Sequence, residues 1–222
     1  MKNTIINILK IRRNSLDSIV VMMSTFNGSE YIQEQIESIL KQKKVNVKLI
    51  VRDDGSQDET ISILKKYQEK KLLKYFKGNN VKTAKSFMEL VMRAEDSPFY
   101  AFSDQDDIWN EDKLYRAIVK IKETKNFLKK PVVYASDYQL VDSLMRNIKD
   151  YNHITTTSFG ASIAYSSCTG CTMVFNRYLM ERLKGKMPSN LIMHDDWVHK
   201  VCLALGGEVL FDNVKTMRYR QH

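Results

Sequence analysis

The chain has 222 residues, of which 43% are hydrophobic and 27% are charged, so it is long enough for one domain with a sizeable buried core. This composition excludes disordered and collagen-like chains, and no run of about 18 apolar residues predicts a transmembrane helix. The 35 Lys and Arg residues outnumber the 26 Asp and Glu residues, which gives a net charge of +9. Such a charge attracts nucleic acid, anionic lipid or phosphorylated substrates and does not choose among them.

The N-terminal segment 1–17 is basic and partly apolar. It lacks a continuous apolar run and a small-residue cleavage site, so we predict an extension there and no signal peptide. Three cysteines are too few and too sparse for a disulfide framework, which favours a reducing compartment. Cys168 and Cys171 form a C-x-x-C pair with no second pair, so we expect half-buried small side chains there rather than a zinc or thioredoxin-like site.

Strands and helices alternate from residue 19 to residue 122. Ser56 and Glu59 match a capping box in front of the second of these helices. Alternation of this kind predicts a mostly parallel sheet with helices on both faces. The predicted strands are 19–23, 47–51, 73–76 and 99–102, and the predicted helices are 32–40, a helix from 61, 87–94 and 114–121.

Beyond Pro131 the pattern loosens, and no repeat or linker divides the chain. We therefore predict one α/β domain over 18–222. Its second half has predicted strands at 132–134, 172–175 and 208–211, helices from about 177 and after Asp195, and a loop at 144–162.

Acidic pairs follow two of the predicted strands directly. Asp53-Asp54 and Asp106-Asp107 lie just beyond the carboxyl ends of these strands, the edge at which open parallel sheets bind ligands. Asp104 and Asp106 are alternate residues, so their carboxylates can converge on one point. Mg²⁺ or Mn²⁺ would take such oxygens and bridge them to substrate phosphates, which also reconciles an acidic edge with a basic chain. The alternative is a solvated acidic turn.

An ordered set of motifs runs from about residue 18 to the last residue. The set resembles the inverting, GT-A-fold nucleotide-sugar glycosyltransferases of glycosyltransferase family two, in particular the bacterial rhamnosyltransferase-like branch of cell-wall and capsular polysaccharide synthesis. The resemblance implies a Rossmann-like, mostly parallel central sheet flanked by helices, with a smaller mixed subregion on the acceptor side. The matching strings are Ser24–Gly28, Asp53–Thr60, Ser103–Trp109, Thr169-Gly170, His194–Trp197 and Tyr219–His222.

For the donor, the resemblance implies a nucleotide-sugar-binding half at 18–125. Thr25 and Asn27 would contact the base and the ribose, and Asp53 or Asp54 would bind the imide of the base. Asp104 would contact the ribose. Asp106 would hold the metal, with His222 completing the metal or diphosphate site, and Lys85 would contact the diphosphate.

For the chemistry, the resemblance implies an acceptor and catalytic half at 126–222. Asp195 corresponds to the catalytic base, with the adjacent Asp196 as the less favoured candidate. Trp109 and Trp197 either stack on acceptor sugars or pack in the core, and the sequence leaves both open.

Two residues depart from the pattern of this branch. Lys82 stands where relatives have a glycine, and Ser86 stands where they have an asparagine, although Lys85 keeps its place. Close approach of the backbone to substrate at residue 82 is therefore in question.

The sequence thus predicts a metal-dependent glycosyltransferase that uses dTDP-rhamnose or a UDP-hexose and a lipid-linked or oligosaccharide acceptor. We expect a cytoplasmic protein in peripheral contact with anionic lipid at the inner face of the membrane. A sugar nucleotidyltransferase is disfavoured because the loop after the first strand has one glycine and no lysine. A basic nucleic-acid-binding module is disfavoured because acidic pairs at the binding edge would repel a phosphate backbone.

Overall fold

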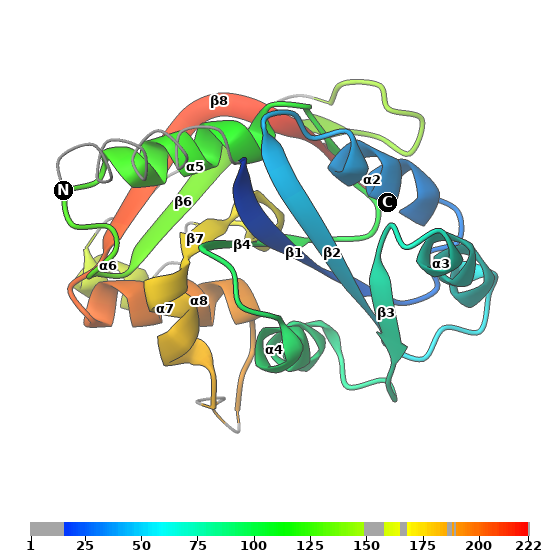
Figure 1. Cartoon of the computed structure of the whole chain (residues 1–222), viewed down its shortest axis with the longest axis horizontal. Coiled ribbons are helices and arrows are strands. Elements are labelled where there is room, and N and C mark those ends of the chain that lie inside the picture. Colours follow the sequence, from blue (N-terminus) through cyan, green and yellow to red (C-terminus); the bar gives the residue numbers. More distant parts are fainter. Residues whose placement is uncertain (1–15, 149–157, 165–167, 186–187, 189, 222) are drawn as a thin grey trace, which may run out of the picture.

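The computed structural model describes residues 16–148, 158–164, 168–185, 188 and 190–221, and it shows a central sheet with helices on both faces (Figure 1). In the first half of the chain, the elements are β1 (Asp17–Thr25), α2 (Ile32–Leu40), β2 (Val45–Asp53), α3 (Thr60–Glu69), β3 (Lys74–Lys77), α4 (Thr83–Arg93), β4 (Phe99–Ser103), β5 (Ile108–Trp109) and α5 (Lys113–Glu123).

The second half contributes the remaining strands of the same sheet. Its elements are β6 (Val132–Val141), α6 (Phe159–Ala164), the short 3-10 helix η1 (Gly170–Thr172), β7 (Val174–Asn176), α7 (Arg177–Leu183), α8 (His194–Ala204) and β8 (Glu208–Arg220).

The sheet has the strand order β3-β2-β1-β4-β7-β6-β8-β5. The first four strands are parallel, as the alternation of strands and helices predicted. β7 runs antiparallel to both β4 and β6, and β8 pairs parallel with β6 and antiparallel with β5. The sheet is therefore parallel from β3 to β4 and mixed beyond β4, which confirms the predicted α/β class.

Two apolar clusters cover the two faces of the sheet. Along β1, Ile19, Val21 and Met23 point into one cluster, whereas Val20 and Met22 point into the other. This alternation buries β1 on both sides and explains its continuous apolar sequence. Figure 1 shows α2 and α5 over the first face and α4, α7 and α8 over the second.

The predicted capping box of α3 is wrong. The side chain of Glu59, the residue before the helix, caps no backbone N–H. Asp58 accepts a hydrogen bond from the Thr60 N–H at 3.0 Å instead. The Ser56 hydroxyl accepts a hydrogen bond from the Asn27 N–H at 2.9 Å instead of one from the first turn of α3.

The predicted boundaries fail most in the second half of the chain. β8 runs to Arg220 rather than ending at residue 211, because an irregularity in its pairing with β6 absorbs Asn213 and Val214 and the strand then continues. η1 occupies the start of the predicted strand 172–175, and α6 begins inside the predicted loop 144–162 and ends two residues beyond it. Of that loop, residues 149–157 lie outside the described residues.

Candidate active site

The carboxyl ends of the parallel strands open into a pocket of about 550 Å³. Asp54 follows β2 and Asp106 follows β4, and both line this pocket together with Thr25 at the end of β1. Phe87 of α4 and Arg220 of β8 form further parts of the wall. The two acidic clusters therefore share one edge of the sheet, as predicted, and both halves of the chain contribute to the pocket.

Gln105, the central residue of the D-x-D string, connects two of the loops around the pocket. Its Oε1 accepts from the Thr25 hydroxyl at 2.6 Å and from the Phe26 N–H at 2.9 Å. Its Nε2 donates to the Phe26 carbonyl at 3.2 Å. Gly28 packs so closely against this amide that an added Cβ would overlap it. These contacts fix Thr25, and sequence reasoning missed Gln105.

Asn27 is exposed and joins the first loop to the second. It has a φ of 48°, a left-handed conformation that Asn tolerates. Its Oδ1 accepts from the Gln57 N–H at 2.9 Å, and its own N–H donates to Ser56. Asn27 thus has a turn-forming role next to Phe26, which lines the pocket, and its predicted contact with a nucleotide stays a prediction.

Asp53 and Asp54 have different surroundings. Asp53 is fully buried, and its Oδ2 accepts from the Gly55 and Ser56 N–H groups, whereas its Oδ1 has no partner among the described residues. Asp54 lines the pocket and accepts from the Val81 N–H at 2.9 Å and the Lys82 N–H at 3.1 Å. Asp54 is thus the one of the pair that faces the pocket.

Arg52 is 1% exposed and lies beneath Asp54. Its guanidinium donates to Asp54, to Glu89 at 2.9 Å and to the Asn79 carbonyl at 3.0 Å. It also donates to the Ser86 hydroxyl at 3.1 Å. One buried cation therefore ties the end of β2 to α4 and to the loop before it.

Asp104 and Asp106 meet at the pocket floor. Burial, followed by the charges of Asp106 and Asp195, raises the pKa of Asp104 to about 7. This places three carboxylates close enough to interact. Below them, burial also raises the pKa of Asp107, which lies beside the buried thiol of Cys171.

Lys113, the first residue of α5, supplies a buried positive charge near this acidic floor. Its Nζ lies 3.4 Å from the Thr216 hydroxyl and 4.8 Å from the centre of the Trp109 ring. Burial lowers its pKa to about 8, and the neighbouring Cys171 and Asp107 oppose that shift. The C-x-x-C string therefore places Cys171 in a buried polar cluster, and all three cysteines are buried rather than half-buried.

Arg220 fixes the backbone of the D-x-D string. Its Nε donates to the Asp106 carbonyl at 2.8 Å, and one terminal nitrogen donates to Glu34 at 2.9 Å. Its other terminal nitrogen donates to the Ser143 carbonyl at 2.6 Å, and its guanidinium lies over the Tyr31 ring. Sequence reasoning gave Arg220 no role of its own.

Asp195 lies in the first turn of α8 and is 9% exposed. Its Oδ2 accepts from the Gly170 N–H at 2.9 Å, and its Oδ1 accepts from the Asp196 N–H at 2.8 Å. Burial raises its pKa, which makes its carboxylate a stronger base than that of an exposed aspartate.

Asp196 is differently placed. It forms an ion pair with Lys200 one turn along α8, at 2.7 Å. Trp197 is partly buried and packs against the apolar cluster beneath α8. The structure therefore separates the two adjacent aspartates, with Asp195 near Asp104 and Asp196 paired on its own helix.

Two further predicted site residues, Trp109 and Lys85, are not among the residues that line the pocket. Trp109 is only 3% exposed and packs in the core, which agrees with core packing rather than stacking on an acceptor sugar. Lys85 is exposed on the first turn of α4. His222 lies outside the described residues.

The acidic floor fits a hard divalent cation. Carboxylate oxygens are the ligands that such ions prefer, and the charge of Asp106 contributes to the raised pKa of Asp104, which indicates a concentration of negative charge that a cation would relieve. A second group, Asp104, Asp107 and Cys171, has potential ligand atoms within 4.8 Å of one another. The two deeper members of that group lie near the Lys113 ammonium, which disfavours a metal there.

Comparison with known proteins gives a consistent result. The model of the family "Glycosyl transferase family 2" matches residues 20–183. The dTDP-rhamnosyl transferase RfbG of Shigella flexneri is 27% identical over 218 residues, which cover 90% of this chain and 71% of that protein.

Solved structures resemble this chain in fold. TarS of S. aureus, in complex with UDP, has a TM-score of 0.69 at 23% identity, covering 92% of this chain. The mannosyltransferase PcManGT of Pyrobaculum calidifontis, in complex with GDP-Man and Mn²⁺, has a TM-score of 0.68 at 16% identity and covers 93% of this chain. The present chain spans 60% and 57% of these two chains.

Proposed function

Because the chain belongs to glycosyl transferase family 2, we propose that it transfers a sugar from a nucleotide-diphosphate donor to a glycan acceptor, with inversion of the anomeric carbon. The observation that carries this proposal is the convergence of Asp54, Asp104 and Asp106 on one pocket, with Asp195 close to Asp104. The reaction belongs to the synthesis of a cell-surface polysaccharide, as the similarity to a rhamnosyl transferase supports.

The first requirement of the reaction is to stabilise the departing nucleoside diphosphate. A divalent cation, Mg²⁺ or Mn²⁺, would be held by Asp106 and His222 and would neutralise the charge that develops on the leaving group. Asp104 would bind the ribose, and Lys85 at the start of α4 would add a positive charge near the diphosphate. Arg220 keeps the Asp106 backbone in place through its bond to the carbonyl.

The second requirement is a base for the acceptor hydroxyl. Asp195 suits this role because burial raises its pKa and because the Gly170 N–H holds its carboxylate in one orientation. Attack by the acceptor on the face opposite the leaving group inverts the anomeric carbon. Asp196 is less suited, since Lys200 pairs with it.

For the donor, we propose dTDP-rhamnose or a UDP-hexose. A relative is named for dTDP-rhamnosyl transfer, and a structural neighbour binds UDP. Thymine and uracil offer the same imide edge, and Asp54 at the pocket wall or the buried Asp53 would accept from it. Thr25 and Asn27 would contact the base and ribose from the first loop.

For the acceptor, we propose a lipid-linked oligosaccharide reached at the inner face of the cell membrane. Trp197 beside the proposed base would contact acceptor sugars. No helix among the described residues is long and apolar enough to cross a bilayer. We also propose a peripheral contact with the membrane, supported by the excess of basic residues.

The pair of adjacent aspartates gives a matched test of this function. Asp195→Asn should lower kcat by about a hundredfold to ten-thousandfold, because the general base is lost while the shape is kept. Asp196→Asn, the matched control, should change kcat by less than about threefold, since a partly exposed ion pair contributes little. Both sugar transfer and donor hydrolysis are measured from the amount of nucleoside diphosphate that is released. Wild-type kcat in Asp195→Asn would contradict the proposed base.

A further inference from the structure

His194, the first residue of α8, is an aromatic contact rather than a polar one. It is 3% exposed, and its ring stacks on Phe87 with centroids 3.9 Å apart and planes at 17°. The Phe102 ring contacts it edge to face, with ring centroids 4.8 Å apart and ring planes at 88°. Neither ring nitrogen has a hydrogen-bond partner among the described residues, and burial lowers its pKa to about 3. The imidazole is therefore a neutral, flat ring in an apolar site.

Gly170 lies against this ring and against Asp195. A Cβ on Gly170 would lie 2.7 Å from His194 Nε2 and 3.3 Å from the Asp195 Cβ. The same residue donates its N–H to Asp195 Oδ2 at 2.9 Å. Only a glycine allows the backbone to reach the carboxylate while the imidazole occupies the adjacent space.

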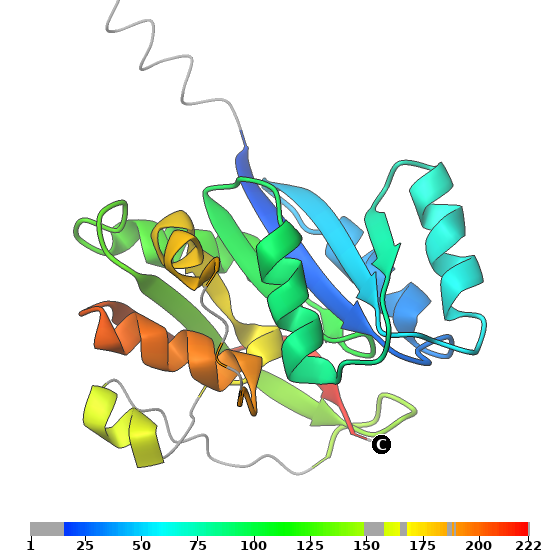
Figure 2. The ribbon, with the colours of Figure 1, turned by 90° about the horizontal axis from the view of Figure 1, so that it is seen from below.

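Phe87 connects this contact to the donor pocket. It lies on α4 and lines the pocket wall, and its ring packs against those of His194 and Phe102. Figure 2 shows α4 and the start of α8 side by side on one face of the sheet. The imidazole thus sets the spacing between the pocket wall and the first turn of α8, where Asp195 lies.

We propose that His194 and Gly170 are positioning residues for Asp195. Gly170 orients the carboxylate through its N–H, and His194 acts as a neutral spacer that fixes α8 against Phe87. The proposal rests on the proposed function, in which Asp195 is the base. It gives His194 no proton-transfer role, although the H-D-D-W string alone would suggest one.

The test uses His194→Phe, His194→Ala, Gly170→Ala and the double variant with both alanines. Donor turnover is measured with UDP-glucose and with dTDP-rhamnose, in Mn²⁺, with water as acceptor. His194→Ala and Gly170→Ala should each lower kcat about tenfold to a hundredfold, because small displacements of a catalytic group have effects of this size. Binding of UDP with Mn²⁺ should change less than threefold in both.

Two readouts separate positioning from a general loss of structure. His194→Phe keeps a flat ring, so it should recover most of the kcat lost in His194→Ala, with the wild-type pH–rate profile. In the double variant the methyl group of Ala at residue 170 meets no imidazole. The kcat of the double variant should therefore be close to that of His194→Ala. The same cycle on urea midpoints, measured without donor, should show the same non-additivity.

The outcomes distinguish this inference from the proposed function. Additive losses in the double variant, or a His194→Phe enzyme that is as slow as His194→Ala and has lost a limb of its pH profile, would overturn the positioning role. Asp195→Asn serves as the reference. If it lowers kcat while the Gly170 and His194 variants do not, the inference alone fails. If Asp195→Asn turns over as wild type, the assignment of the base fails and the inference fails with it.

Discussion

Arg52 shows how the site tolerates a buried positive charge. The guanidinium has an acceptor on each side, and the loop before α4 contributes a carbonyl as well as the two N–H groups that reach Asp54. A buried cation is stable only when its hydrogen bonds are satisfied in this way. The wall of the pocket next to Asp54 therefore depends on a residue that does not itself line the pocket.

Replacing Arg52 should be costly for stability. Arg52→Met keeps most of the volume but leaves Asp54 buried without its cation, so we expect a loss of about 3 kcal/mol in the free energy of unfolding. Urea denaturation measures this loss. The control is Arg146→Met, since Arg146 pairs with Asp142 on the surface with 74% of its side chain exposed and should change stability by less than about 1 kcal/mol. Equal effects of the two variants would contradict the role given to Arg52.

Among the elements, α4 begins in an unusual way. Lys82, the residue before its first turn, has φ 71° and ψ 160°, a backbone region that is almost restricted to glycine. Its N–H donates to Asp54 at 3.1 Å, and this bond holds the chain in that conformation. The position thus keeps a glycine-like backbone although the sequence has a lysine there.

Lys82→Gly should therefore raise the stability of the protein. Relief of the backbone strain exceeds the extra conformational freedom that glycine gives to the unfolded chain, and we expect a net gain of about 1 kcal/mol. Thermal and urea unfolding measure it, with Lys85→Gly as the control. That control removes a lysine from the helix itself and should lower stability by about 1 kcal/mol. A Lys82→Gly protein less stable than wild type would show that the lysine side chain stabilises the loop.

The sequence predicted those elements whose hydrophobic pattern is visible within the element itself. β1 has an unbroken apolar run because both of its faces are buried, and α2 places Ile32, Ile36 and Ile39 on one buried side. β8 was predicted to be too short because Asp212 and Asn213 resemble a turn, whereas pairing with β6 carries the strand through an irregularity. Such tertiary pairing has no local signal.

Residues of the candidate site divide in the same way. The acidic pairs could be placed at one edge because strand ends of a parallel sheet share that edge. Gln105 and Arg220 could not be found, since their bonds join residues 79 and 114 positions apart in the chain. The burial of Trp109 could not be predicted either. A tryptophan that follows an acidic string can stack on a sugar or pack in the core, and the sequence alone does not distinguish the two.

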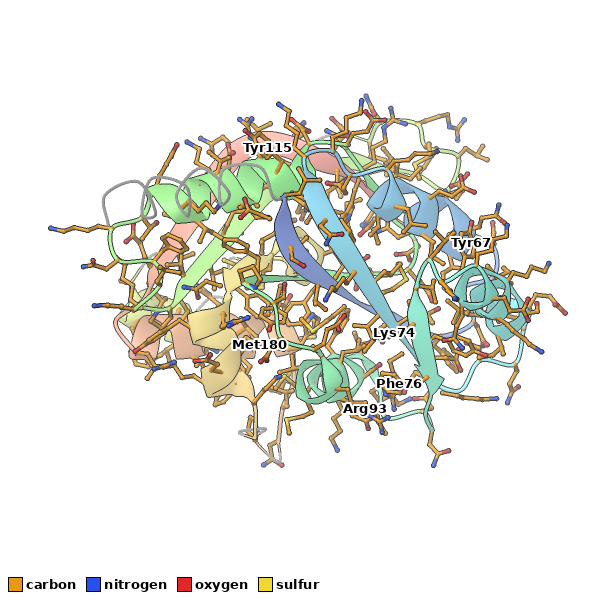
Figure 3. All side chains as sticks on the ribbon, in the orientation of Figure 1. Tyr67, Lys74, Phe76, Arg93, Tyr115 and Met180 are labelled. Atoms are coloured by element: carbon orange, nitrogen blue, oxygen red, sulfur yellow. The ribbon has the colours of Figure 1, made fainter. Side chains whose placement is uncertain are left out.

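On the scale of the whole molecule, the net charge of +9 contrasts with the acidic floor of the pocket. Basic side chains gather at the β3 edge of the sheet, where Lys74 and Arg93 lie close to Phe76 (Figure 3). Arg93 lies 4.3 Å above the Phe76 ring, and Lys48 and Lys74 both approach Glu95. These three basic side chains are not among the residues that line the pocket.

Vesicle binding should follow this charge. We expect the protein to sediment with phosphatidylcholine vesicles that contain phosphatidylglycerol and to remain in solution with pure phosphatidylcholine. Raising salt from 50 to 500 mM should release it, because screening shortens the reach of surface charges to a few ångströms. Equal binding to both kinds of vesicle would contradict an electrostatic contact with the membrane.

The central claim is a metal-dependent nucleotide site at Asp106. Its most direct test is a thermal-shift series with UDP, dTDP, GDP and CDP, each with Mn²⁺ or with EDTA, on wild type, Asp106→Ala and the control Asp196→Asn. In the presence of Mn²⁺, UDP or dTDP at about a hundredfold over its dissociation constant should stabilise wild type and the control by roughly 2.7 kcal/mol. With EDTA neither nucleotide should stabilise them, and Asp106→Ala should not be stabilised under either condition. A wild-type protein that no nucleotide stabilises, or an equal shift in Asp106→Ala, would contradict the account.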